Sequence, residues 1–129
     1  YIKKKSKLYK WVGYAVLSEE DMHYLYDNFD DEDIISTTRA LADKLAEDSG
    51  KIGIVAYYDT KEKTDLIQFR MRRSQHYKKY DLRDLLKIMH IHNGGGHEGA
   101  IGFRLPKDAV NEYQHYVVAM VKKVNSLLP

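Results

Sequence analysis

The residues that point most directly to chemistry lie between positions 90 and 102. This stretch reads HIHNGGGHEGAIG and holds five of the eight glycines and three of the six histidines of the chain. Three glycines in a row are costly in conformational entropy, so they indicate a backbone that needs a positive φ or a very close approach. The successive N–H groups of such a loop can bind a phosphate, and a histidine beside them adds a donor or a positive charge. The candidate anion-binding residues are Gly94, Gly95, Gly96, His97 and the small Ala100.

Two other interpretations of this stretch remain open. In the first, a helix ends at Asn93 and Gly94 and the remaining glycines form a loose turn. In the second, the imidazoles of His90, His92 and His97 bind a metal, with one carboxylate nearby in the sequence. The run is not a Walker loop, because no Gly-Lys-Ser/Thr follows it, and it is not a dinucleotide-binding turn, because it precedes a strand.

A second candidate group is basic and lies at the end of a strand predicted over 66–73. The guanidinium groups of Arg72 and Arg73 can pair with a phosphate through two hydrogen bonds or stack on a base. Neighbouring side chains of a strand point to opposite faces, so at most one of the two arginines faces a ligand, with Arg70 or Ser74 nearby. The alternative is that these arginines only form surface ion pairs.

Hydrophobic periodicity predicts the elements that position these groups. We expect strands over 11–17, 52–58, 66–73 and 100–104, and helices beginning after Ser18, over 34–47, over 81–89 and from Pro106. Ser18 and Asp81 are predicted helix N-caps, and Gly50 is a predicted left-handed helix end. The short polar segment between the second and third strands indicates an antiparallel hairpin. This order predicts a single-domain α/β sandwich over residues 1–129, in which helices flank a mixed β-sheet that contains one hairpin.

Composition excludes several classes of protein. The 129 residues suit one domain, and a net charge of +2 argues against a protein that coats long polyanions. The positive charge is local, because residues 70–87 hold seven Lys or Arg and two Asp, a balance of 7 − 2 = +5. The absence of cysteine excludes disulfides, thiolate zinc sites and cysteine nucleophiles. No apolar run approaches the ~20 residues of a membrane span, so we expect no membrane contact by this segment. The absence of cysteine favours a reducing compartment, and we expect a cytoplasmic location.

The two candidate groups together resemble a known family. Arg73-Ser74 and the later run GGGHEGAIG are similar to the C-terminal substrate-binding domain of DHH phosphoesterases, whose signature is an Arg-Ser strand followed by Gly-Gly-Gly-Gly-His-x-x-Ala-Ala-Gly. The resemblance extends over most of the chain from Trp11 onward. Asn93 stands in place of the first glycine and Ile101 in place of the second alanine, and the larger Ile101 can narrow the pocket.

The resemblance implies a division of labour between two domains. Members of this superfamily include nanoRNases, cyclic-dinucleotide phosphodiesterases and single-strand exonucleases, in which a separate N-terminal domain holds two manganese ions through Asp and His residues, including an Asp-His-His motif. This chain contains no Asp-His-His. We therefore expect no catalytic residue and no cofactor in this chain, with Mn²⁺ in the absent catalytic domain.

The implied role is to bind a nucleotide or a short single-stranded oligonucleotide and to present its scissile phosphate to the N-terminal catalytic domain of the same polypeptide. The residues expected to bind it are Arg72, Arg73, Ser74, Gly94, Gly95, Gly96, His97 and Ala100. Because Tyr1 stands where a methionine would begin a chain, we expect a fragment of a phosphodiesterase or phosphatase that is inactive alone.

Two other functions remain open besides substrate binding for a phosphoesterase. The 11 tyrosines and the local basic segments would also suit a stand-alone nucleotide- or RNA-binding module, because tyrosine rings can stack on bases. A purely structural domain, in which the glycines form only a turn, is the other alternative, and a homodimer is possible.

Overall fold

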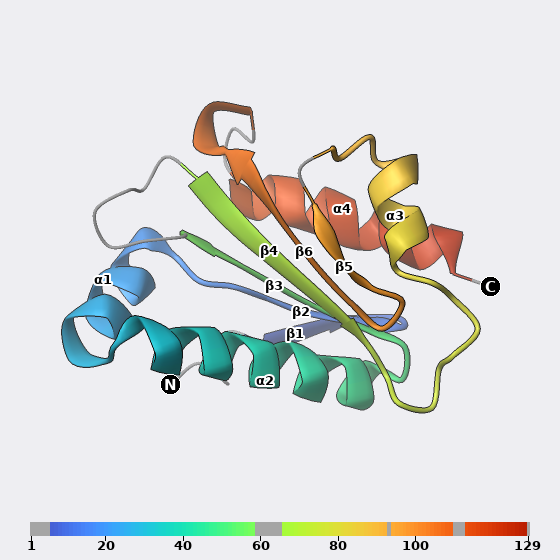
Figure 1. Cartoon of the computed structure of the whole chain (residues 1–129), viewed down its shortest axis with the longest axis horizontal. Helices are drawn as coiled ribbons and strands as arrows, with labels where there is room; N and C mark the ends of the chain where they lie inside the picture. The colour runs from blue at the N-terminus through green and yellow to red at the C-terminus, as the bar shows by residue number, and fades with distance from the viewer. Residues whose placement is uncertain (1–5, 59–65, 93, 110–112, 129) are drawn as a thin grey trace.

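A mixed β-sheet forms the middle layer of the molecule (Figure 1). The computed structural model describes residues 6–58, 66–92, 94–109 and 113–128, and within them six strands pair in the order β1-β2-β3-β4-β6-β5. The parallel pairing is β2–β3, and the other neighbours are antiparallel. The strands are β1 (Ser6–Tyr9), β2 (Val12–Val16), β3 (Ile52–Tyr58), β4 (Leu66–Arg73), β5 (Gly95–His97) and β6 (Ala100–Pro106).

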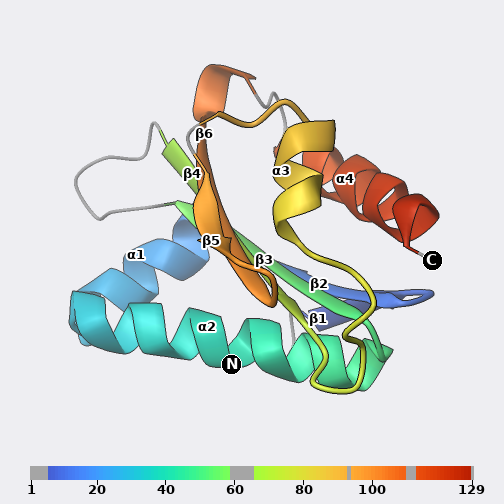
Figure 2. The same ribbon diagram turned by 45° about the vertical axis from the view of Figure 1, so that its right-hand side comes forward.

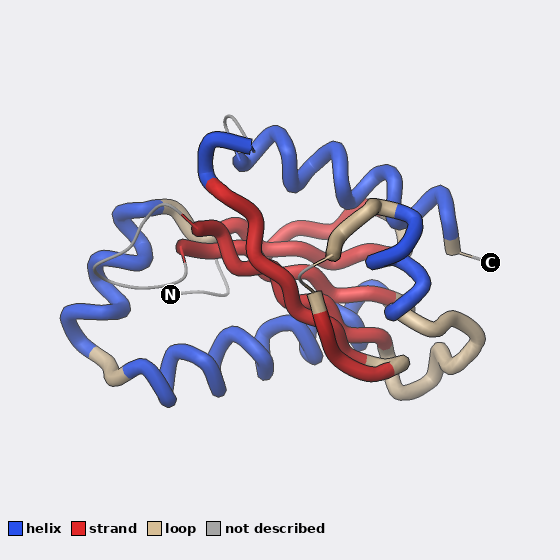
Figure 3. The backbone as a smooth tube through the Cα atoms, turned by 45° about the horizontal axis from the view of Figure 1, so that its top comes forward, coloured by secondary structure: helices blue, strands red, loops and turns tan. Residues whose placement is uncertain are grey.

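Helices cover both faces of this sheet (Figures 1 and 3). One face carries α1 (Glu19–Asn28) and α2 (Asp31–Ser49), and the other carries α3 (Arg83–Ile88) and α4 (Tyr113–Leu127). A short 3₁₀ helix, Lys107–Ala109, follows β6. The predicted α/β class, the mixed sheet and the β3–β4 hairpin are confirmed.

The predicted N-terminal cap of α1 and the predicted C-terminal end of α2 are also confirmed. The Ser18 hydroxyl accepts the Asp21 N–H at 3.1 Å, and the Asp21 carboxylate accepts the Ser18 N–H at 2.9 Å, which together form a capping box at α1. Gly50 ends α2 with a φ of 96°, in the left-handed region that glycine adopts without steric cost.

Other predicted boundaries are wrong. The last helix begins at Tyr113 instead of Pro106, because Pro106 still pairs with Leu66 as the end of β6. Asp81 does not cap α3 at its N-cap position. Its carboxylate accepts the backbone N–H of Arg83 at 3.0 Å and pairs with the Arg83 guanidinium at 2.7 Å, and these contacts lower the pKa of Asp81 to about 2. The edge strands β1 and β5 were not predicted.

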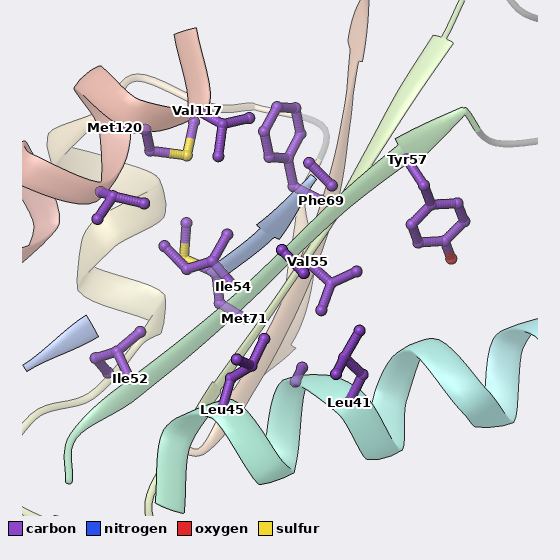
Figure 4. Packing of buried hydrophobic residues seen from close by; sticks show 14 of the residues in the cluster. Leu41, Leu45, Ile52, Ile54, Val55, Tyr57, Phe69, Met71, Val117 and Met120 are labelled. Atoms are coloured by element: carbon purple, nitrogen blue, oxygen red, sulfur yellow. The ribbon is translucent and has the colours of Figure 1, made fainter. Parts of the chain in front are cut away.

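The hydrophobic core lies on both sides of β3 and β4 (Figure 4). Leu41 and Leu45 of α2 pack beneath one face of the sheet. On the opposite face, Phe69 and Met71 lie below Val117 and Met120 of α4, and a sandwich of sheet and helices results. The Phe69 ring stacks on that of Phe103 from β6, with centroids 4.9 Å apart, so the core extends to the strand that borders the candidate site.

The helix α2 rests directly on the backbone of the sheet. A Cβ atom added at Gly53 would lie 2.0 Å from the carbonyl oxygen of Ala42, and one added at Gly13 would lie 2.7 Å from that of Leu45. No side chain fits at either position without moving the helix away. The two glycines therefore set the distance between α2 and the sheet.

We predict that Gly53→Ala lowers the free energy of unfolding by about 2 kcal/mol, because the added methyl group must displace α2 from a packed core. Urea unfolding followed by circular dichroism measures the change. Ser36→Ala, on an exposed position of the same helix, is the control and should shift stability by less than about 0.5 kcal/mol. Equal stability of the two variants would contradict the close contact between α2 and β3.

Candidate anion-binding cleft

A cavity of about 750 Å³ opens where β4, β6 and β5 extend beside α2. From here on it is called the cleft. Its side walls include Ile35 and Arg39 of α2 and Arg70 and Arg72 of β4, and its floor is the glycine-rich part of β5 and β6. Figure 2 shows β5 and β6 above α2 at this edge of the sheet. The glycine run predicted as an anion-binding loop is therefore an edge strand and a turn.

The pairing register determines which residues form the floor. Gly102 lies opposite both Arg70 on β4 and Gly95 on β5, and Ala100 lies opposite both Arg72 and His97. Residues in such a row point to the same face of a sheet. On the cleft face, the two arginines of β4 thus lie beside a strand, β6, whose residues opposite them are only glycine and alanine.

The three consecutive glycines have different structural roles. Gly96 has a φ of 139°, and a Cβ atom there would lie 2.1 Å from the Ala100 carbonyl oxygen, so glycine is required. A Cβ atom at Gly94 would lie 2.7 Å from the Leu86 side chain. At Gly95 a Cβ atom would meet nothing within 4 Å. Packing therefore explains Gly94 and Gly96, whereas Gly95 is a glycine whose effect is to keep the cleft floor open.

The lining of the cleft is strongly basic. Among the described residues it contains four arginines, Arg39, Arg70, Arg72 and Arg104, and no carboxylate. The Arg70 Nε donates to the Tyr57 hydroxyl at 2.8 Å, and the Arg72 Nε donates to Asp43 at 2.6 Å. These hydrogen bonds hold both side chains in place while leaving other guanidinium N–H groups for an anion.

The imidazole of His97 is held in one orientation by its own turn. Its Nδ1 accepts the backbone N–H of Gly99 at 3.1 Å. A neutral imidazole with Nδ1 as acceptor carries its proton on Nε2, so this hydrogen bond assigns the tautomer. The Nε2–H of His97 is then a donor on an exposed side chain at the cleft.

Arg73 and Ser74 do not line the cleft. The Arg73 side chain is 14% exposed, donates to the Tyr80 carbonyl oxygen at 2.7 Å and lies 3.8 Å from Glu98. It therefore holds the segment after β4 against the β5–β6 turn. The expected opposite orientation of Arg72 and Arg73 agrees with these contacts, since Arg72 pairs with Asp43 on α2.

Ser74 fastens the same segment to α2. It is buried, and its hydroxyl donates to Glu47 at 3.1 Å. The Gln75 N–H donates to the other Glu47 oxygen at 2.7 Å. These two hydrogen bonds, that from Gln75 foremost, hold the pKa of the Glu47 carboxyl below its usual range. Arg73 and Ser74 thus position the strand end next to the cleft.

Three further residues of the cleft lining are Ile101, Arg39 and Arg104. Ile101 is 4% exposed and pairs with Met71 on the core face of the sheet, and it also borders the cleft. Sequence analysis did not identify Arg39 and Arg104. Arg104 could be predicted from the sequence, because it lies two residues after Gly102 and four after Ala100 and so shares one face of the strand with them. Arg39 could not be predicted, because the sequence does not show which side of α2 borders the open edge.

The described residues contain no group of three or more His, Cys, Asp or Glu side chains that could hold a metal ion. The proposed metal site at His90, His92 and His97 is therefore not formed there, and these residues do not fit a manganese pair. No helix among the described residues is long and apolar enough to cross a membrane.

A second cavity, of about 570 Å³, lies between α1 and α2. Its lining is mostly apolar, includes Tyr24 and Phe29, and contains neither glycine nor arginine. Its one basic side chain among the described lining residues, Lys44, is accompanied by the carboxylate of Asp33, whereas four arginines line the cleft, so the cleft is the better candidate for anion binding.

Comparisons with known proteins identify a family and a similar fold. The family model described as the DHHA1 domain matches residues 21–123. The fold is similar to that of the pGpG-specific phosphodiesterase PggH from Vibrio cholerae, with a TM-score of 0.56 and 15% sequence identity. That match covers 97% of this chain and 36% of PggH, so the chain spans about a third of that protein's length. A comparison with curated protein sequences finds no match.

We predict that Gly96→Ala destabilises the chain and Gly95→Ala does not. The first methyl group would collide with the Ala100 carbonyl oxygen at a positive φ, and the second would enter open space. Thermal unfolding should show a loss of several degrees for Gly96→Ala and a change of about a degree or less for Gly95→Ala. A comparable loss for both variants would mean that Gly95 is required for packing.

Proposed function

Because this chain belongs to the DHHA1 domain family, we propose that it binds the phosphate groups of a nucleotide or short single-stranded oligonucleotide in the cleft. The observation that carries the proposal is the glycine floor, open at Gly95, in a cleft that four arginines line. Bare glycines let a ligand approach the strand backbone, and guanidinium groups match the geometry of phosphate oxygens. The exposed Nε2–H of His97 supplies a further donor at the same floor.

The walls of the cleft suit the other parts of a nucleotide. Ile35 of α2 is 36% exposed at the cleft and offers an apolar surface to a base or a ribose. Arg70 is fixed by the Tyr57 hydroxyl, and a fixed guanidinium loses less conformational entropy when it binds a phosphate. In this proposal Asp43 holds Arg72 in the same way, while Arg73 and Ser74 contribute by positioning the end of β4.

The chain acts as the substrate-binding part of a larger phosphoesterase in this proposal. Hydrolysis by two metal ions needs carboxylate and imidazole ligands that hold both cations. The described residues contain no such group, and in this proposal a DHH catalytic domain holds the metal ions. What this chain does is bind and orient the phosphate, and Mn²⁺ would belong to the other domain.

The first test measures binding of a 5′-phosphorylated dinucleotide to the 129-residue chain by calorimetry. We predict that Arg39→Ala weakens binding roughly tenfold, because one charged hydrogen bond is lost, and that Gly95→Val blocks the floor and weakens it at least as much. Both variants should keep the parent's melting temperature.

Arg83→Ala is the matched control for this test. Arg83 is an exposed arginine that pairs with Asp81 and does not line the cleft, so its removal should leave dinucleotide affinity unchanged. Parent-like affinity in both cleft variants, or an equal loss in the control, would contradict binding in the cleft.

A separate prediction concerns catalysis. The 129-residue chain incubated with Mn²⁺ and a dinucleotide should leave the substrate intact, because the described residues provide no cage for two cations. Anion-exchange chromatography of the reaction mixture measures the product. Hydrolysis that is lost on adding a chelator would contradict the division between binding and catalytic domains.

A further inference from the structure

A second basic and aromatic surface lies at the other edge of the sheet. Lys10 and Trp11 connect β1 to β2 in a two-residue turn, since Tyr9 pairs directly with Val12. Trp11 is the single tryptophan of the chain, and 52% of its surface is exposed. Two strands, β3 and β4, separate β2 from the β6 strand of the cleft, so this surface is distinct from the cleft.

Lysine side chains from three parts of the chain gather on the aromatic rings of this surface. The Lys51 ammonium lies 4.9 Å from the centre of the Trp11 ring. The ammonium groups of Lys10 and Lys122 lie 5.6 Å and 5.9 Å from the centre of the Tyr9 ring. We call these five residues, Tyr9, Lys10, Trp11, Lys51 and Lys122, the Trp11 patch. Three cations thus lie beside two aromatic rings at one edge.

The backbone at Lys10 adds an independent observation. Its φ is 52°, in the left-handed region, where a lysine in a two-residue turn is less stable than glycine or asparagine. When a non-glycine residue keeps an unfavourable backbone conformation, a function of its side chain is a reasonable hypothesis. Here that side chain places a positive charge over the Tyr9 ring, beside an exposed tryptophan.

We propose that the Trp11 patch binds single-stranded nucleic acid, with a base stacked on Trp11 and backbone phosphates paired with the lysines. Exposed aromatic rings next to cations are the combination by which proteins bind single strands without reading sequence. The proposal does not rest on the function proposed for the cleft, because it uses none of the cleft residues.

The positive charge of Lys51 has a competing explanation, which is that it stabilises a helix. Lys51 follows the C-terminal end of α2, where a cation offsets the helix dipole. Lys10 distinguishes nucleic-acid binding from helix stabilisation, because it lies in the β1–β2 turn and belongs to no helix. A lysine that only offsets a helix dipole would contribute to stability, and one that binds phosphate would contribute to affinity.

The single tryptophan makes the first experiment direct. The 129-residue chain is titrated with an oligo(U) and an oligo(dT) of about 15 nucleotides, and the fluorescence of Trp11 is recorded. The expected result is saturable quenching by both strands that weakens as salt is raised. Quenching by phosphatidylserine-containing vesicles or a polyglutamate peptide, and not by the oligonucleotides, would overturn the proposal in favour of a membrane or an acidic protein.

The decisive variant is Lys10→Gly, followed by fluorescence anisotropy of a labelled oligo(U). Glycine relieves the positive φ, so the melting temperature should stay the same or rise. The affinity should fall severalfold, and the slope of log K against log salt should become shallower by about 0.7, the value for one phosphate contact on a single strand. Unchanged affinity and slope would overturn the proposal.

Three further variants complete this experiment. Trp11→Ala should weaken binding roughly tenfold, which is the loss of one stacked base. Lys44→Ala is the matched control, because Lys44 is an exposed lysine that pairs with Asp48 away from the patch, and it should bind like the parent. Arg39→Ala should also quench like the parent. Quenching that is lost in Arg39→Ala and kept in Lys10→Gly would place the strand in the cleft and overturn the assignment to the Trp11 patch.

Discussion

The contact of α2 with the bare backbone at Gly13 and Gly53 is the constraint on which the rest of the structure depends. Because α2 lies so close to β2 and β3, it covers the centre of the sheet and leaves the cleft face of β6 and β5 open beside it. The same position brings Arg39 and Asp43 level with the cleft arginines. Two glycines far from the cleft in the sequence therefore set how closely α2, which forms one wall of the cleft, lies against the sheet.

The sheet also separates residues that are adjacent in the sequence. Arg72 faces α2 and the cleft, whereas Arg73 faces the opposite side and ties the next segment to Tyr80 and Glu98. A motif that contains both arginines thus combines a group that lines the cleft with a group that positions the end of the strand. Gly95 and Gly96 divide in the same way, since Gly95 leaves open space and Gly96 permits close strand pairing.

Sequence reasoning succeeded where a local physical signal is strong and failed where tertiary contacts decide. The capping box at Ser18 and the left-handed end at Gly50 could be predicted, because both depend on neighbouring residues. The strand β5 could not be predicted, because GGH has low strand propensity and is held by pairing with β6. Arg39 could not be assigned, since helical periodicity does not show which side of α2 borders an open sheet edge.

The fold separates the acidic and basic residues that together give the small net charge. The acidic residues that begin α1 and α2 lie in their first turns, where they offset the helix dipoles. Four arginines lie instead in the cleft, and three lysines lie in the Trp11 patch. A field of this kind is strong only close to each cluster, because a nearly neutral molecule has little long-range attraction for polyanions and salt screens the remainder within about 10 Å. Each cluster therefore attracts only phosphates that lie close to it, which is why the proposed phosphate binding is assigned to the cleft and to the Trp11 patch separately.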